Sequence, residues 1–90
     1  MDCYNIIIKA SAKKELSALP KPIISRLIHA IETLATDPRP NGVRKLAGVQ
    51  NIYRVRVSDY RIVYRIEDDK LIIEVIRVAH RKEAYRKDKS

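Results

Sequence analysis

The spacing of apolar residues in the first half of the chain predicts one strand followed by two helices. The β-branched run from Tyr4 to Lys9 is typical of a strand. A short helix is expected over Ser11 to Leu19, because the serine at its start can cap it. Pro20 and Pro22 interrupt that helix and suit the first turn of the next one. From Ile23 to Ala35 apolar residues recur every three to four positions, which predicts a helix with one face on the core.

Beyond a turn-rich segment over residues 37–42, the period of the apolar residues changes to two. Three β-rich runs follow, separated by short polar turns: Ile52 to Val57, Tyr60 to Ile66 and Leu71 to Ala79. Such runs predict an antiparallel meander. The expected order is therefore β-α-α-β-β-β, an α+β fold in which an antiparallel sheet carries two helices on one face. We expect residues 1–90 to form a single domain.

Side chains alternate along the first two of these runs in a way that separates charge from apolar surface. Tyrosine, valine and isoleucine dominate one set of alternate positions and arginine the other, and alternate residues of a strand point to opposite faces. If the helices cover the apolar face, the other face presents a compact cationic surface: Arg54, Arg56, Arg61 and Arg65. The third run is largely apolar at both sets of positions, so its inward face stays open. Glu74 is a candidate partner that would neutralise part of the cationic surface.

The charge of the chain is strongly positive and unevenly distributed. The formal net charge is +8, and the hydrophobic content of 46% is enough to build a core, which excludes a disordered chain. Residues 39–90 carry fourteen basic and seven acidic groups, so nearly all of the excess lies there. Such a field attracts polyanions, which favours nucleic acid or an acidic protein as partner. A merely solubilising surface is the alternative.

Several classes of protein do not fit the sequence. No apolar run approaches the roughly 20 residues that cross a bilayer, and residues 1–10 lack the pattern of a secretory signal. The single cysteine, Cys3, cannot form an internal disulfide, which favours a reducing cytoplasm. There is no glycine-rich phosphate loop and no cysteine or histidine spacing for a metal, so we expect neither metal nor cofactor.

Three stretches together resemble the RelE/ParE superfamily of bacterial toxins, and more closely its RelE branch. They are the arginine-alternating hairpin from Tyr53 to Ile66, the tail from His80 to Tyr85 that follows the last strand, and the LAG sequence from Leu46 to Gly48. The likeness spans the whole chain. It implies a metal-independent endoribonuclease that cuts messenger RNA in the ribosomal A site and is neutralised by a cognate antitoxin. It leaves open whether the antitoxin also mediates binding to operator DNA.

The resemblance also implies roles for individual residues. Cleavage by attack of a 2′-hydroxyl on its own phosphate needs in-line positioning, proton transfer and charge stabilisation. Arg61 and Arg81 match the phosphate-contacting arginines of the family, and Tyr85 matches a tyrosine that acts as base or stacks on a nucleotide. His80 is the side chain suited to proton exchange near neutrality. The group that takes the proton stays open. The expected substrate-binding residues are Arg54, Arg56 and Arg65.

Two other functions fit the same scaffold. One is a ParE-like toxin that binds and inhibits DNA gyrase without performing chemistry. The other is a non-enzymatic, basic RNA-binding module, in which the arginines only neutralise phosphates and affinity depends strongly on salt.

Overall fold

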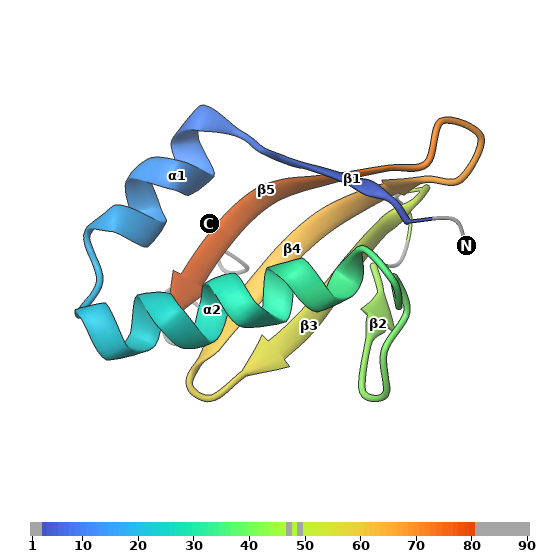
Figure 1. Ribbon diagram of the computed structural model, residues 1–90. Coiled ribbons are helices and arrows are strands. Elements are labelled where there is room, and N and C mark those ends of the chain that lie inside the picture. The colour runs from blue at the N-terminus through green and yellow to red at the C-terminus, as the bar shows by residue number, and fades with distance from the viewer. Residues whose placement is uncertain (1–2, 47, 49, 81–90) are drawn as a thin grey trace.

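The computed structural model describes residues 3–46, 48 and 50–80 of the 90-residue chain. Its elements follow in this order: β1 (Asn5–Ile8), α1 (Ala10–Ser17), α2 (Lys21–Leu34), β2 (Arg44–Lys45), β3 (Ile52–Val57), β4 (Tyr60–Glu67) and β5 (Ile72–His80) (Figure 1). The predicted order of strand, two helices and three-stranded meander is confirmed. The short β2 was not expected, because two consecutive exposed basic residues show no apolar alternation.

The two helices begin differently, and only one begins as expected. α2 follows Pro20, whose carbonyl accepts the backbone N–H groups of Ile23 and Ile24, and it has a proline in its first turn. α1 starts one residue early, with Lys9 in the cap position and no side-chain cap, so the expected cap at Ser11 is wrong. The Lys9 N–H donates to the Val75 carbonyl at 2.9 Å. The hydrogen bonds between β1 and β5 therefore extend to Lys9, the residue just before α1.

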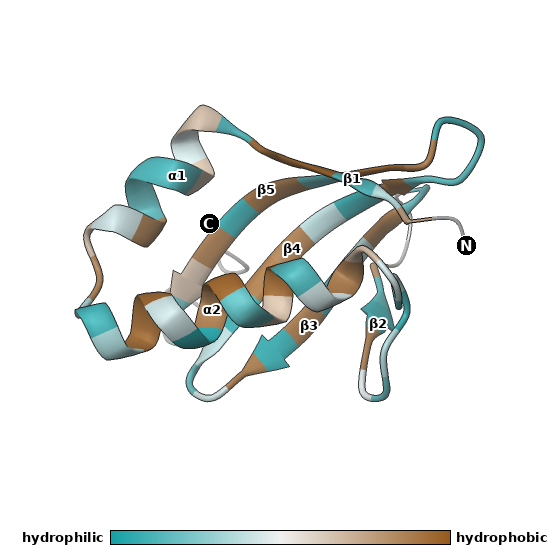
Figure 2. Cartoon of the chain, viewed as in Figure 1, coloured by the Kyte–Doolittle hydropathy of each residue, from teal (hydrophilic) through white to brown (hydrophobic). Residues whose placement is uncertain are grey.

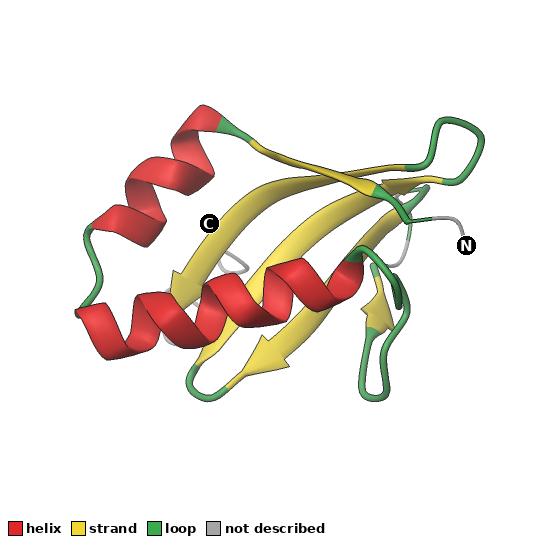
Figure 3. Cartoon of the chain, viewed as in Figure 1, coloured by secondary structure: helices red, strands yellow, loops and turns green. Residues whose placement is uncertain are grey.

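The sheet has five strands in the order β1-β5-β4-β3-β2. Strands β3, β4 and β5 form the predicted antiparallel meander. β1 lies parallel to β5 at one edge, and β2 lies antiparallel to β3 at the other. Both helices lie on the same side of this sheet, with α2 crossing over its middle strands (Figure 3). The expected α+β fold, with helices on one face, is confirmed.

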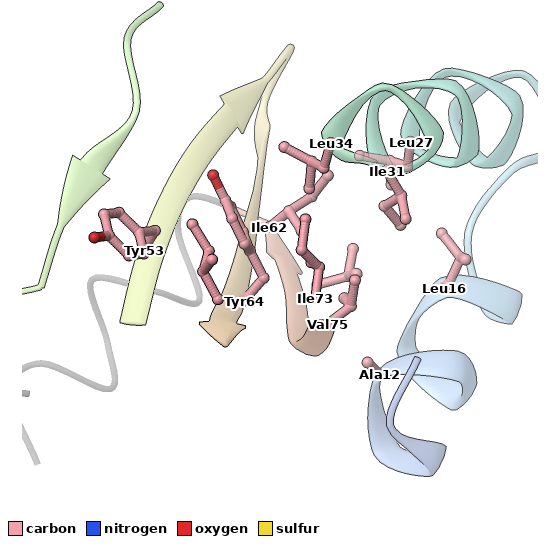
Figure 4. Packing of buried hydrophobic residues seen from close by; sticks show 12 residues of the cluster. Ala12, Leu16, Leu27, Ile31, Leu34, Tyr53, Ile62, Tyr64, Ile73 and Val75 are labelled. Atoms are coloured by element: carbon pink, nitrogen blue, oxygen red, sulfur yellow. The ribbon is translucent and has the colours of Figure 1, made fainter. Parts of the chain in front are cut away.

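The hydrophobic core lies between that face and the helices. Apolar and polar residues alternate along α2 (Figure 2), and Leu27, Ile31 and Leu34 are its buried residues in the core. Ala12 and Leu16 of α1 contribute to the same cluster. Figure 4 shows the helix side chains facing the inward residues of the sheet. The largest side chains with almost no exposed surface are Leu27, Ile31, Leu34, Ile62, Tyr64, Ile66, Ile73 and Val75. Among the described residues, no helix is long and apolar enough to cross a membrane.

A β-bulge in β5 explains why its inward face was unreadable from the sequence. Val63 of β4 lies opposite Arg77, but the next residue, Tyr64, lies opposite Val75, so Ile76 is an extra residue in β5. The alternation of β5 changes phase at this point. Its buried, inward residues are Ile73, Val75 and Val78, whereas Glu74, Arg77 and Ala79 pair with residues of β4 that share the opposite face.

Candidate functional site

The register of the strands places the predicted arginines on the face opposite the helices. Arg56 of β3 lies directly across from Arg61 of β4, and Arg54 lies across from Val63. Directly opposed residues of an antiparallel pair share a face. Arg44 of β2 lies across from Arg54 and therefore joins the same face.

These arginines surround a hollow of about 330 Å³, which we call the arginine hollow. It is lined by Asn41, Gly42, Arg44, Arg54, Val55, Arg56 and Arg61. Three of the four arginines predicted from strand alternation thus converge on one site. Arg44 and the Asn41-Gly42 turn were missed, and the only signal for them was a basic pair directly after a turn sequence. No acidic side chain occurs among the described residues that line the hollow.

The electrostatics of the arginine hollow favour an anion. Arg56 and Arg61 are directly opposed, and like charges in that arrangement destabilise a sheet. The Arg56 Nε atom donates to the Ser58 carbonyl at 3.1 Å, which holds this side chain at the β3–β4 turn. Guanidinium groups bind phosphate oxygens through two parallel hydrogen bonds. A phosphate backbone in the hollow would therefore relieve the repulsion.

Arg65 is on the predicted face and forms an ion pair there. Its Nη1 atom donates to Glu74 Oε1 at 2.9 Å, and both side chains are partly exposed. The expectation that Glu74 neutralises part of the cationic surface is confirmed for this residue. Arg65 does not belong to the lining of the arginine hollow. In this structure Arg65 forms an ion pair between β4 and β5, and its assignment to substrate binding stays a prediction.

His80 lies away from the arginine hollow. Ala79 is opposite Arg61 in the sheet, so the next residue, His80, is opposite Tyr60 on the other face. The His80 and Tyr60 rings pack edge to face, with centroids 5.1 Å apart. Both line a separate hollow that also involves Glu15 and Leu19 near the end of α1. The structure therefore does not bring His80 together with Arg61, because neighbouring residues of a strand point to opposite sides.

Arg81 and Tyr85 lie outside the described residues. β5 ends at His80, so Arg81 follows it directly in the sequence. Their expected contacts with phosphate and with the reacting nucleotide stay predictions.

The loop that carries Asn41 and Gly42 is held at its start by polar contacts with the sheet. Arg39 donates to Asp68 in the β4–β5 turn and to the Tyr53 hydroxyl, and Asp68 also accepts a 2.6 Å hydrogen bond from Tyr4. The bonds from Arg39 and then from Tyr4 lower the pKa of the Asp68 carboxyl. The same carboxylate raises the pKa of Tyr4 and of Arg39. The Arg39–Asp68 ion pair is therefore charged across the physiological range.

The donor set of the site suits phosphate rather than a metal ion. Among residues 3–46, 48 and 50–80, no group of three or more His, Cys, Asp or Glu side chains is arranged to hold a cation. The lining of the arginine hollow offers guanidinium donors and one amide side chain. It can bind and orient an anion, and it can stabilise negative charge that develops there.

Comparison with known proteins agrees with this geometry. The sequence model of the family described as ParE toxin of type II toxin-antitoxin system, parDE, matches residues 6–85. The chain belongs to the RelE/ParE toxin superfamily. It is 30% identical to toxin RelE of Mycobacterium tuberculosis, over 92% of this chain and 87% of that toxin. The chain is thus a type II toxin of the RelE family.

Solved structures of this superfamily have the same fold. The toxin-antitoxin complex RelBE2 of Mycobacterium tuberculosis contains a chain that matches with a TM-score of 0.79 and 25% identity, over 90% of this chain and 94% of that one. The archaeal RelE-RelB complex of Pyrococcus horikoshii matches with a TM-score of 0.79 and 28% identity, over 88% of this chain and 96% of that one. Both similarities cover about nine tenths of this chain.

Proposed function

We propose that this protein is a metal-independent endoribonuclease that cuts messenger RNA in the ribosomal A site. The single observation that supports the proposal most is the arginine hollow, in which Arg44, Arg54, Arg56 and Arg61 line one space on the face opposite the helices. Its volume of about 330 Å³ is within the range of small-ligand sites and suits part of a nucleotide chain. The proposed substrate places the activity in the cytoplasm.

In the proposed reaction, the 2′-oxygen of one nucleotide attacks its own 3′-phosphate. The 2′-hydroxyl gives up its proton to a base as its oxygen bonds to phosphorus. The bond from phosphorus to the 5′-oxygen breaks, the 5′-oxygen leaves with a proton, and a 2′,3′-cyclic phosphate remains. Arg61, together with Arg81 beyond β5, stabilises the charge on the five-coordinate phosphorus, because arginine stays protonated. Arg44, Arg54 and Arg56 bind the flanking phosphates. Tyr85 transfers a proton or stacks on a base. His80, which lies beside Tyr60 on the other face, stays a predicted group for proton exchange.

Mapping of mRNA ends on translating ribosomes tests the proposal. The wild-type protein is expected to produce breaks within A-site codons, and Arg61→Ala to lower the cleavage rate at least tenfold by losing charge stabilisation, which is typically worth about 10²–10³. Arg26→Ala is the matched control, because it removes the same charge from the exposed surface of α2. Intact message with the wild-type protein would overturn the proposal. Unfolding of Arg61→Ala, seen by circular dichroism, would assign that arginine to the fold instead.

An antitoxin is the proposed protein partner. The similar structures from Mycobacterium tuberculosis and Pyrococcus horikoshii are toxin-antitoxin complexes. The net charge of +8 makes an acidic partner favourable, because complementary charge speeds association and suppresses wrong partners. Co-expression of the adjacent small reading frame, followed by co-purification, tests this partner. Binding of operator DNA through the antitoxin belongs to the same proposal and is tested by a mobility shift with both proteins.

Inhibition of DNA gyrase is the second candidate function. The matching family description names the ParE toxin of parDE systems, which favours this activity on the same scaffold. A supercoiling assay separates the two candidates. Loss of gyrase activity at low protein concentration, together with intact mRNA on ribosomes, would favour this second function over the ribonuclease.

A further inference from the structure

The loop between α2 and β2 forms one wall of the arginine hollow. Figure 1 shows it descending from the end of α2 to β2, beside β3. Asn41 and Gly42 line the hollow directly, and Arg44 begins the strand that follows. Gly42 has φ +85°, and a Cβ atom built there would meet nothing within 4 Å. The tip of this wall at Gly42 is therefore open, whereas Val43 after it packs against the core.

On the side before Asn41, polar contacts of Arg39 anchor the wall to the sheet. Its Nη2 atom donates to Asp68 Oδ2 at 2.9 Å, and its Nη1 atom lies 3.4 Å from Asp68 Oδ1. Its Nε atom donates to the Tyr53 hydroxyl at 3.3 Å, and the guanidinium carbon lies 5.1 Å from the centre of the Tyr53 ring. The Tyr4 hydroxyl fixes Asp68 from the other side. One guanidinium thus joins the loop to β3 and to the β4–β5 turn.

Only a short stretch of chain separates this anchor from the hollow. The backbone N–H of Val43 donates to the Pro40 carbonyl at 3.1 Å, which closes a tight turn around Asn41 and Gly42. Pro38 and Pro40 flank Arg39 and restrict the backbone on both sides of it. A change in the position of Arg39 is therefore expected to move the Asn41-Gly42 turn as well.

We propose that the Arg39–Asp68 pair positions the Asn41-Gly42 wall and Arg44, and thereby sets the affinity of the arginine hollow for single-stranded RNA. Arg39 and Asp68 are positioning residues, because they touch the loop and the sheet rather than the hollow. The choice of RNA rests on the proposed function, whereas the effect on the loop does not.

The pair is not needed for the stability of the fold. The Arg39 and Asp68 side chains are 43% and 51% exposed, and ion pairs of that exposure contribute little to unfolding free energy. Neither residue belongs to the buried core. Substitutions at these positions are therefore expected to give folded proteins in which only the loop has changed.

Two substitutions with opposite effects on charge provide the test. Arg39→Gln removes a positive charge and Asp68→Asn removes a negative one, so an account based on net charge expects them to change RNA affinity in opposite directions. The positioning account expects both to weaken binding of a fluorescent RNA hexanucleotide, by about fivefold. The double variant should be no weaker than either single one, because both act through one contact. Asp69→Asn, next to Asp68 in the turn, is the matched control.

Amide hydrogen exchange of Val43, measured by NMR, reports on the stability of the Asn41-Gly42 turn in the absence of RNA. Exchange is expected to be faster in Arg39→Gln and in Asp68→Asn, and unchanged in Asp69→Asn. Unchanged Val43 exchange in both variants would overturn the inference, as would equal or tighter RNA binding by Asp68→Asn. If the wild-type protein bound no RNA while Val43 exchange still rose in both variants, the loop anchor would stand and the proposed function would fail.

Discussion

Tyr64 combines full burial with one hydrogen bond. Its side chain has no exposed surface, and its hydroxyl donates to the Pro38 carbonyl at 2.8 Å. Burial raises the pKa of this phenol well above its ordinary value, so the hydroxyl keeps its proton and remains a donor. Its ring stacks with that of Tyr53, and the two centroids are 6.1 Å apart. Figure 4 shows both side chains on the sheet. Pro38, the residue before Arg39, is thus fixed by a hydrogen bond from a core side chain.

Replacement of Tyr64 by phenylalanine should therefore destabilise the fold measurably. The ring is retained, but the Pro38 carbonyl, which accepts this part-buried hydrogen bond, loses its donor. The loss of such a partner costs up to about 1–3 kcal/mol. Urea unfolding is expected to show a lower midpoint with an unchanged slope. A loss below about 0.5 kcal/mol would mean that water replaces the hydroxyl.

The carboxyl group of Asp68 should titrate below the ordinary aspartate range of about 3.9. Arg39 and Tyr4 both donate to it and lower its pKa. A lowered folded pKa means that the contribution of the contact is complete above the ordinary value and is lost as the pH falls through the folded one. NMR titration of the side-chain carboxyl tests this, and Arg39→Gln should move the midpoint upward. An unchanged midpoint in that variant would contradict the assigned cause.

At the scale of elements, α1 substitutes for a missing strand at one edge of the sheet. β1 pairs with β5 only as far as Ile8 and Val75. Beyond the bulge, the N–H of Val78 donates to Glu15 Oε1 at 2.9 Å, and the Nε atom of Arg77 donates to Glu15 Oε2 at 3.2 Å. One carboxylate from the helix therefore satisfies the edge of β5 close to the end of the described chain.

Replacement of Glu15 by alanine should loosen this end of β5. The Val78 amide is expected to exchange faster, and the fold to lose about 1 kcal/mol, because the acceptor is charged but partly exposed. Glu15→Gln keeps one acceptor oxygen and should show a smaller effect. Glu32→Ala, on the exposed side of α2, serves as control. Equal exchange of Val78 in the alanine variant and the wild type would contradict this role.

At the scale of the whole molecule, charge is gathered on one face. The carboxylates that form ion pairs in the described chain hold Arg39, Arg65 and Arg77. The arginines that line the hollow have no carboxylate among its described lining residues. The arginine hollow is therefore a cationic site on the face opposite the helices.

The salt dependence of RNA binding should report how many of these arginines contact phosphate. For single-stranded RNA, each neutralised phosphate contributes about 0.7 to the slope of log affinity against log salt, so four contacts predict a slope of about −3. Arg54→Ala and Arg44→Ala should each reduce the slope by about 0.7. Arg26→Ala, with the same change in net charge, should leave it unchanged. Equal slopes for all variants would show that binding follows the overall field.

The sequence by itself determined the order of the first strand, the two helices and the meander, and it determined the arginine face. The three-to-four spacing of apolar residues from Ile23 to Ala35 reflects a helix face, and the alternation from Tyr53 to Ile66 reflects the two faces of a strand. Both periods are local properties of the backbone. For this reason the sequence alone assigns Arg54, Arg56 and Arg61 to one face of the sheet.

Only the tertiary structure decided which arginines share a site. Arg44 enters the hollow through a two-residue strand, and Arg65 is bound by Glu74 from β5. The bulge at Ile76 and the pairing of His80 with Tyr60 set the faces of the last strand. These features depend on register between segments far apart in the sequence, and a one-residue shift in register exchanges the two faces. The periodicity of a single strand does not depend on that register. Strand pairing therefore decides which arginines line the hollow.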